Sequence, residues 1–311
     1  TSTQTSTIQM RIENRYFGNG TTGLDSATID LTFNRDIVVR DNIKQEVRIA
    51  AGYLPNSANI HFTNGINVGS GSTSFVRFYY EDNVNLDSSL TGHVENTVFD
   101  ISGNLSGSNP IYVDANNYAG TYNSPTFTIF LSGDNSGYSG RLTVGADTAT
   151  TLNPRRNAIV RIGSATALGS DVAVNFRNGG SLQIGGMNLT TTKNFLFTGG
   201  VGLGTSAGIE NASSTAATIT FDSGTQSGPT YQDVGVGLRN GTATGYFGSG
   251  GASLSVVKIG SGETVFGAST GGAALDDFSN YTGSTLVQEG TLIAGSNNSF
   301  SPYSRFVVSS G

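Results

Sequence analysis

Similar segments recur along this sequence at long and uneven intervals. An aliphatic residue followed by Glu-Asn occurs three times, at 12–14, 94–96 and 209–211. Self-similarity with a long period is typical of repeat architectures, in which extra residues between repeats become surface loops. The sequence therefore predicts a single β-solenoid over residues 1–311, built from three diverged copies at 12–93, 94–208 and 209–311.

Further pairs of segments support this repeat. The segment IHFTNG at 60–65 is echoed by VNFRNG at 174–179. YSGRLTV at 138–144 parallels YTGSTLV at 281–287, and residues 163–179 parallel 295–311 at a constant offset of 132 without a gap. The uneven offsets place insertions and deletions between the markers, as solenoids tolerate.

The apolar residues lie in short alternating runs, for example at 255–259, 285–287 and 291–293, that end at Gly, Asn or Ser. Alternation with period two is typical of half-buried strands, and the small residues supply tight corners. Charged residues make up only 12% of the chain, whereas 44 of its 311 residues are Gly. We therefore expect an all-β fold of stacked parallel strands with essentially no helix.

Two adjoining segments, VVKIGSGETVFGAS at 256–269 and NYTGSTLVQEGTLIAGSN at 280–297, resemble the passenger-associated repeat of bacterial autotransporters. The matching residues are Lys258, Gly260, Gly262, Tyr281, Thr282, Gly283, Thr285, Val287, Gly290, Thr291 and Leu292. The similar segment LSGDNSGYSGRLTV at 131–144 supplies Tyr138 and Gly140 but lacks the Lys-Gly strand. The resemblance implies a right-handed parallel β-helix displayed outside a bacterial cell. We take Tyr138, Gly140, Tyr281, Gly283, Gly290 and Leu292 as the positions that define its turns and strands.

The densest aromatic stretch is FVRFYYED at 75–82. Alternation places Phe75, Arg77 and Tyr79 on one face of a strand, and Val76, Phe78 and Tyr80 on the other. One face must be core, and the other is a candidate stacking strip for a sugar ring or a partner protein. The candidate interaction surface comprises Phe75, Arg77, Tyr79 and Tyr80, with core plus ordinary surface as the alternative interpretation.

No residue pattern predicts catalysis, a cofactor or a metal. The two histidines, His61 and His93, lack partners at metal-binding or nucleophile spacing. GLGTSA at 202–207 fits a dinucleotide fingerprint only formally, because strand and turn residues follow it instead of a helix. Adjacent carboxylates at 81–82 and 276–277 point to opposite faces of a strand. The charged run at 30–48, which includes Asp30, Asp36, Asp41, Arg35 and Arg40, alternates in sign and reads as a solvated surface.

Charge and hydropathy exclude further classes of function. Lys and Arg total 16 against 22 Asp and Glu, without a basic cluster, which argues against nucleic-acid binding. No apolar run approaches the ~18 residues of a membrane span, and the absence of Cys excludes disulfides.

We expect a non-enzymatic extracellular or cell-surface protein, either a fibre subunit or a display stalk. The alternatives are an adhesin that binds glycan or matrix ligands, and a polysaccharide lyase or hydrolase on the same fold.

The ends of the sequence do not read as capping segments. Gly311 occupies the position equivalent to Gly179, where the preceding copy continues. Open terminal coils of a solenoid expose unpaired backbone, and a head-to-tail contact between copies propagates into a filament. We therefore expect self-association as the principal partner interaction, with a cut from a longer passenger as the alternative.

Overall fold

The computed structural model describes residues 7–13, 28–39, 46–52, 57–71, 75–82, 96–117, 126–145, 157–176, 180–197, 208–224, 230–232, 238–240, 252–266, 279–295 and 299–309. In these residues the chain forms strands, turns and bends, without a helix. Every strand pairing among them is parallel. The predictions of an all-β chain, of parallel sheets and of no helix are therefore confirmed for this part of the chain. It also contains no helix of the length and apolarity that crossing a bilayer requires.

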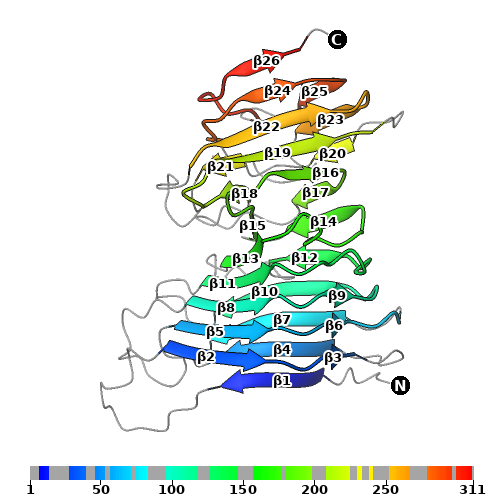
Figure 1. Ribbon diagram of the computed structural model, residues 1–311, viewed down its shortest axis with the longest axis vertical. Helices are drawn as coiled ribbons and strands as arrows, with labels where there is room; N and C mark the ends of the chain where they lie inside the picture. Colours follow the sequence, from blue (N-terminus) through cyan, green and yellow to red (C-terminus); the bar gives the residue numbers. More distant parts are fainter. Residues whose placement is uncertain are drawn as a thin grey trace.

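Two large sheets run side by side along most of the molecule (Figure 1). The seven-stranded sheet contains, in order, β1 (Thr7–Glu13), β4 (Glu46–Gly52), β7 (Phe75–Asp82), β10 (Ile111–Asn117), β12 (Leu142–Val144), β14 (Ala173–Phe176) and β17 (Asn194–Phe197). The eight-stranded sheet contains β2 (Thr28–Phe33), β5 (Ser57–Phe62), β8 (Asn96–Ile101), β11 (Thr126–Leu131), β13 (Asn157–Ile162), β15 (Ser181–Gln183), β18 (Gly208–Asn211) and β21 (Leu238–Asn240).

Three smaller sheets complete the architecture. The N-terminal three-stranded sheet contains β3 (Ile37–Val38), β6 (Ile66–Asn67) and β9 (Leu105–Ser106). The five-stranded sheet contains β16 (Leu189–Thr191), β19 (Ala217–Asp222), β22 (Leu254–Ile259), β24 (Thr285–Val287) and β26 (Phe306–Val308). The C-terminal three-stranded sheet contains β20 (Thr230–Gln232), β23 (Glu263–Phe266) and β25 (Thr291–Ala294).

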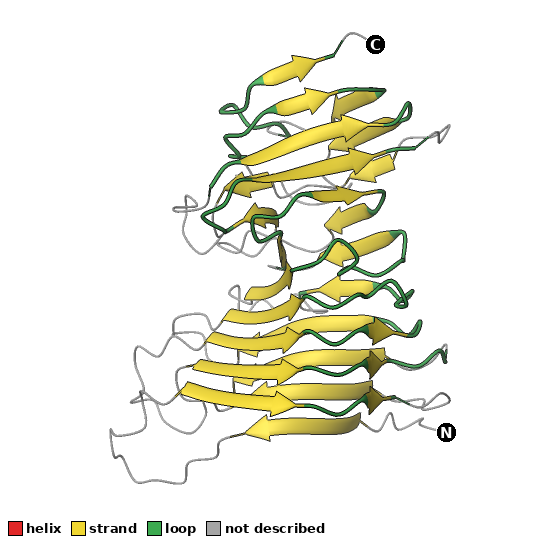
Figure 2. Ribbon diagram, in the orientation of Figure 1, coloured by secondary structure: helices red, strands yellow, loops and turns green. Residues whose placement is uncertain are grey.

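The chain visits the sheets in a repeating order. In the N-terminal half each circuit passes through the eight-stranded sheet, the N-terminal three-stranded sheet and the seven-stranded sheet, as in β2–β3–β4 and β5–β6–β7. Each strand then pairs with its equivalent from the preceding circuit, so the strands stack along one long axis with the termini at opposite ends (Figure 1). The described loops between strands, green in Figure 2, differ in length, which fits the uneven offsets between sequence markers.

The strands do not form one continuous set of sheets, and the expectation of a single solenoid over residues 1–311 is corrected on this point. On one side, pairing shrinks after β9 to an isolated bridge between Gly107 and Tyr138, and residues 163–168 form bends and turns. On this same side, strand pairing among the described residues resumes with β16 of the five-stranded sheet. On another side the seven-stranded sheet ends at β17, which contacts β20 of a separate sheet.

The core lies between the sheets and follows from the alternation of side chains. On the eight-stranded sheet, aligned inward positions hold Ile60, Phe99 and Ile129, each at most 1% exposed. Aromatic rings meet along the axis, as Phe62 and Phe99 do with centroids 5.6 Å apart. Because each circuit buries only a thin layer, stability depends on contacts between neighbouring circuits.

Candidate functional site

The candidate interaction surface lies where β4, β7 and β10 run side by side in the seven-stranded sheet. Arg48 pairs in register with Arg77, and Arg77 with Tyr112, so these three residues share the outward face. Tyr79 lies opposite Asp114 on the same face. The side chains of Val76, Phe78 and Tyr80 point inward and are at most 1% exposed.

The structure therefore separates the four residues of this candidate surface. Phe75 and Arg77 are half-buried on the outward face, and Tyr79 is also outward but only 7% exposed. Tyr80 belongs to the core, where its ring stacks on that of Phe127 with centroids 6.3 Å apart. A ligand approaching the outward face would meet Phe75 and Arg77, and would not reach Tyr80.

The charges on this face bind one another across three strands. The Arg77 guanidinium lies 2.7 Å from a carboxylate oxygen of Glu46 on β4 and 2.8 Å from one of Asp114 on β10. Arg48 approaches the same Glu46 oxygen at 2.7 Å. The side chains of Arg77, Glu46 and Asp114 are only 15%, 13% and 6% exposed. Because these side chains are well shielded, removal of one partner would leave an uncompensated buried charge.

Aromatic rings surround the same guanidinium. Arg77 lies 5.6 Å from the centroid of Phe75 and 5.7 Å from that of Tyr112. Those two rings meet edge to face at 5.1 Å, and Arg48 lies 5.2 Å from the Tyr79 centroid. Within this cluster the cations are already matched by carboxylates and ring faces. These contacts connect β4, β7 and β10 to one another. The sequence pattern did not reveal them, because the partners lie 31 to 37 residues apart.

A second group of ionisable side chains lies on the outward face of the eight-stranded sheet. His61 on β5 approaches Asp30 on β2 through Nε2 at 3.2 Å and Asp100 on β8 through Nδ1 at 3.0 Å. A neutral imidazole carries one N–H, so only the protonated ring can donate to both carboxylates. The outward position of His61 agrees with its sequence alternation, but its partners depend on strand register.

The two repeat-defining tyrosines occupy equivalent positions, each before a strand of a different sheet. Tyr138 and Tyr281 are each at most 1% exposed and precede strands β12 and β24 by four residues. Their hydroxyls are hydrogen-bonded, that of Tyr138 to the backbone of Ile111 and Arg141, and that of Tyr281 to Thr285 Oγ1 at 2.6 Å. Burial raises the pKa of both phenols, and it raises that of Tyr138 well above the ordinary value.

The glycine two residues after each tyrosine lies against the preceding circuit. A Cβ at Gly140 would lie 2.4 Å from the carbonyl oxygen of Asn109, and one at Gly283 would lie 2.3 Å from that of Leu254. Neither distance is compatible with a side chain, so both positions require Gly. The Gly of the Tyr-x-Gly pattern thus allows two successive circuits to pack closely against each other. Leu292, on β25, packs against the core, and Gly290 has a φ of +70° in the turn before that strand.

The aligned segments after these tyrosines also take equivalent pairings. Leu142 pairs with Val174, and Thr285 pairs with Phe306. The offset of 132 in the sequence matches Val174 to Phe306, so the alignment joins residues with the same pairing role. By contrast, IHFTNG contributes to β5 of the eight-stranded sheet, whereas VNFRNG contributes to β14 of the seven-stranded sheet. The copy boundaries at 12–93, 94–208 and 209–311 stay a prediction.

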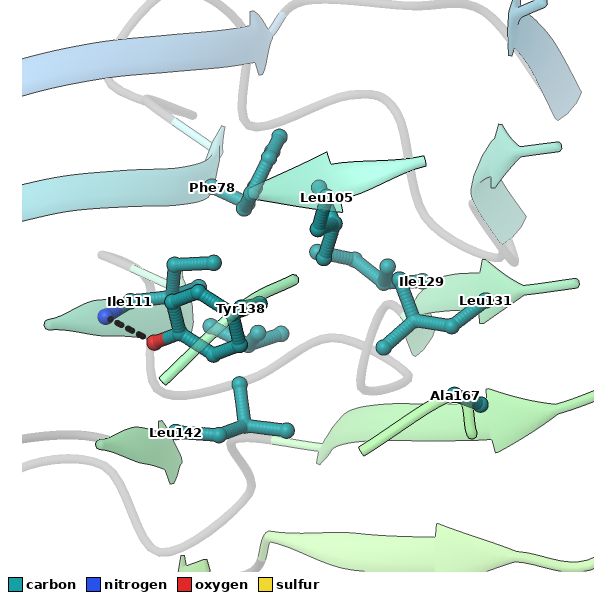
Figure 3. A pocket seen from close by; sticks show the side chains of 9 residues that line it. Phe78, Leu105, Ile111, Ile129, Leu131, Tyr138, Leu142 and Ala167 are labelled. Carbon is teal, nitrogen blue, oxygen red and sulfur yellow. Dashed lines mark hydrogen bonds between the residues drawn. The ribbon is translucent and has the colours of Figure 1, made fainter. Parts of the chain in front are cut away.

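A small cavity lies in the core between the circuits that contain β7, β10 and β12 (Figure 3). It measures about 10 Å³ and is lined by nine apolar or aromatic residues, among them Phe78, Leu105, Ile129 and Tyr138. That volume holds about one water-sized sphere, whereas ligand pockets enclose ~300 Å³ or more. The cavity is a packing defect of the core.

The remaining sequence candidates are distributed without a common site. Among the described residues, no group of three or more His, Asp or Glu side chains is arranged to hold a metal ion. Several of these candidates lie outside the described residues: His93, Asp41, Arg40, the pair at 276–277, the motif at 202–207 and the side chains at 81–82.

No protein-family model, curated protein or solved structure matches the chain.

Proposed function

We propose that this chain is a non-enzymatic structural rod, a right-handed parallel β-helix that is exported and forms a fibre or display stalk at a bacterial cell surface. The resemblance of residues 256–269 and 280–297 to autotransporter passenger repeats supports the extracellular assignment. The outward clusters around Arg77 and His61 support the non-enzymatic part of the proposal, because their side chains contact residues of neighbouring strands instead of converging on an open pocket.

The β-helix assignment is supported by the order in which the chain visits the sheets. Parallel strands that are joined by crossover connections are right-handed in ~98% of cases, because strand twist favours that hand. In this proposal the five sheets belong to one helical path whose sides are interrupted near residues 163–168 and between β17 and β20. Small-angle X-ray scattering tests the shape, since an elongated particle agrees with the proposal and a compact one contradicts it.

The apolar ends of the stack carry the assembly part of the proposal. Leu31, the first residue of an inward row, is 39% exposed, although its register partner Ile60 is fully buried. At the other end, Phe306 and Val308 continue inward rows of the five-stranded sheet and are 47% and 75% exposed. Among the described strands β26 pairs only with β24, so its other edge offers backbone groups to a parallel strand. A second copy presents such strands in the same direction, and this head-to-tail contact propagates.

Assembly is tested with purified protein by light scattering after size exclusion and by negative-stain imaging over a range of concentrations. Filaments or concentration-dependent oligomers are expected for the unmodified chain. The double variant Phe306→Asp/Val308→Lys should be monomeric, because it places charges in the apolar end. Val172→Asp is the matched control, since Val172 is 67% exposed in the turn before β14, away from both ends. Monomers of the unmodified chain at every concentration would contradict self-assembly.

The non-enzymatic part of the proposal is tested separately. The chain is incubated with pectin, alginate and related acidic glycans, and soluble products are measured. We expect neither product release nor retention on the immobilised glycans, since Arg77 is matched by Glu46 and Asp114. Reproducible product formation would establish a lyase or hydrolase instead, and saturable retention would establish an adhesin.

A further inference from the structure

Lys258 has a core position that is unusual for a charged residue. It follows Leu254 and Val256 at inward positions of β22, and its side chain is fully buried. In register it lies between Phe221 on β19 and Val287 on β24. Lysine is almost never fully buried unless its charge has partners, so the surroundings of the ammonium group decide how it is accommodated.

Oxygen atoms from three successive turns surround that ammonium group. Lys258 Nζ lies 2.8 Å from Ser223 Oγ in the preceding circuit and 2.7 Å from the carbonyl oxygens of Ile259 and Gly260 in its own circuit. The carbonyl oxygen of Glu289 in the following circuit lies at 3.1 Å. We call these four oxygens the turn cage.

The turns are packed so closely that Gly290 has no room for a side chain beside the cage. A Cβ at Gly290 would lie 2.4 Å from the Gly260 carbonyl oxygen and 2.9 Å from Lys258 Nζ. Backbone bonds join the turns directly, from Gln288 N–H to the Lys258 carbonyl at 2.9 Å and from Gly262 N–H to the Gly224 carbonyl at 3.3 Å. The cage is therefore a fixed product of stacked backbone, with its oxygens already oriented inward.

The cage has the ligand chemistry of a monovalent-cation site. All four oxygens are neutral, three of them carbonyls and one a hydroxyl, and rings of carbonyl oxygens replace the hydration shell of K⁺ in selective channels. Calcium sites, by contrast, usually include carboxylate ligands. A neutral amine could donate only two of its N–H bonds to these oxygens, so the geometry matches the charged form. Burial lowers the pKa of Lys258, and the carboxylates of Glu289 and Asp222 oppose that shift.

We propose that the turn cage is a monovalent-cation site that the chain fills with its own Lys258 ammonium, and that it takes K⁺ or NH₄⁺ when this ammonium is removed. The cation holds the carbonyl dipoles of three circuits together, which would otherwise repel one another. This inference concerns the interior of one chain and is independent of the proposed assembly.

The test uses Lys258→Met, which keeps an unbranched apolar side chain in the core and removes the charge. Thermal unfolding is compared in KCl, NH₄Cl, LiCl and choline chloride at one ionic strength. We expect the variant to melt several degrees below the unmodified chain in choline chloride, and to recover part of that loss only in KCl or NH₄Cl. Lys193→Met is the matched control, because the Lys193 ammonium contacts the carbonyl of Asp171 in a partly exposed position. It should respond equally to all four salts.

Three results would overturn the proposal. These are equal melting of Lys258→Met in all four salts, unchanged stability of this variant in choline chloride, and an unchanged K⁺ response after the additional substitution Ser223→Ala. If Lys258→Met does not fold, nitrogen-detected NMR of the unmodified chain decides the matter. A slowly exchanging, protonated Lys258 ammonium is expected, and a neutral or rapidly exchanging amine contradicts the cage.

Discussion

The hydroxyl of Tyr138 accepts a hydrogen bond at 3.1 Å from the backbone N–H of Ile111, which lies 27 residues earlier in the chain (Figure 3). The same hydroxyl donates to the carbonyl of Arg141 at 3.1 Å. One buried side chain therefore bonds the backbone of two successive circuits. Tyr80 is equally buried, but its hydroxyl has no hydrogen-bond partner among the described residues.

This contrast predicts opposite effects of one chemical change. Tyr138→Phe removes a hydroxyl that joins two circuits, while the Ile111 N–H keeps its bond to the Arg141 carbonyl at 3.0 Å. It should therefore lower the free energy of unfolding by about 0.5–1.5 kcal/mol. Tyr80→Phe removes a hydroxyl that lacks a partner, and it should be neutral or stabilising. Denaturant unfolding of both variants checks the pair, and equal losses would contradict the assigned hydrogen bonds.

Alkaline pH should destabilise the fold through its buried tyrosines. The pKa values of Tyr138 and Tyr281 lie above the ordinary value of 10.0, mainly because of burial. In the pH range above about 10 the unfolded chain releases these protons while the folded chain keeps them. Stability therefore falls as pH rises, by up to about 1.4 kcal/mol per pH unit for each tyrosine.

The measurement compares unfolding from pH 9 to pH 11.5 in the unmodified chain and in Tyr138→Phe/Tyr281→Phe. Lysines with lowered pKa values, such as Lys258, contribute in the opposite direction up to about pH 10.5 in both proteins. The difference between the two proteins isolates the phenols. It should shrink steadily with rising pH, and a constant difference would argue against buried, neutral tyrosines.

Gly140→Ala should be among the most damaging single substitutions. Its Cβ would lie 2.4 Å from the Asn109 carbonyl oxygen, so the two circuits must move apart. We expect a loss of about 3 kcal/mol, typical of forced overpacking. Gly137→Ala is the control, because its nearest atom lies at an ordinary 3.6 Å. Similar losses in the two variants, measured by denaturant unfolding, would refute the close approach.

Arg77→Met should destabilise the three strands that its guanidinium joins. The substitution leaves the shielded carboxylates of Glu46 and Asp114 without this cation, and such a change costs about 3–5 kcal/mol. Adding Asp114→Leu removes one of those carboxylates and should restore part of the loss. A double-mutant cycle of unfolding free energies measures the coupling, and strict additivity would show that the pair contributes nothing.

Local patterns in the sequence carried much of the architecture. Alternation separated Val76 and Phe78 from Phe75 and Arg77, and the structure shows which of these two faces is core. The same parity places Lys258 with Leu254 and Val256. Alternation therefore marks Lys258 as an inward residue, although a lysine in a strand is ordinarily exposed. The Tyr-x-Gly segments predicted equivalent turns because a position that excludes every Cβ leaves a visible trace in the sequence.

The sequence by itself determined an all-β chain of short, parallel, small-cornered strands, since period-two alternation and glycine corners are local properties. Only the tertiary structure decided which residues meet across circuits, such as Arg77 with Asp114, His61 with Asp100, and Lys258 with Glu289. It also decided the division into five sheets. The physical reason is register: paired residues lie 21 to 39 positions apart. Loops of unequal length set that distance anew in each circuit, and a local pattern carries no measure of it.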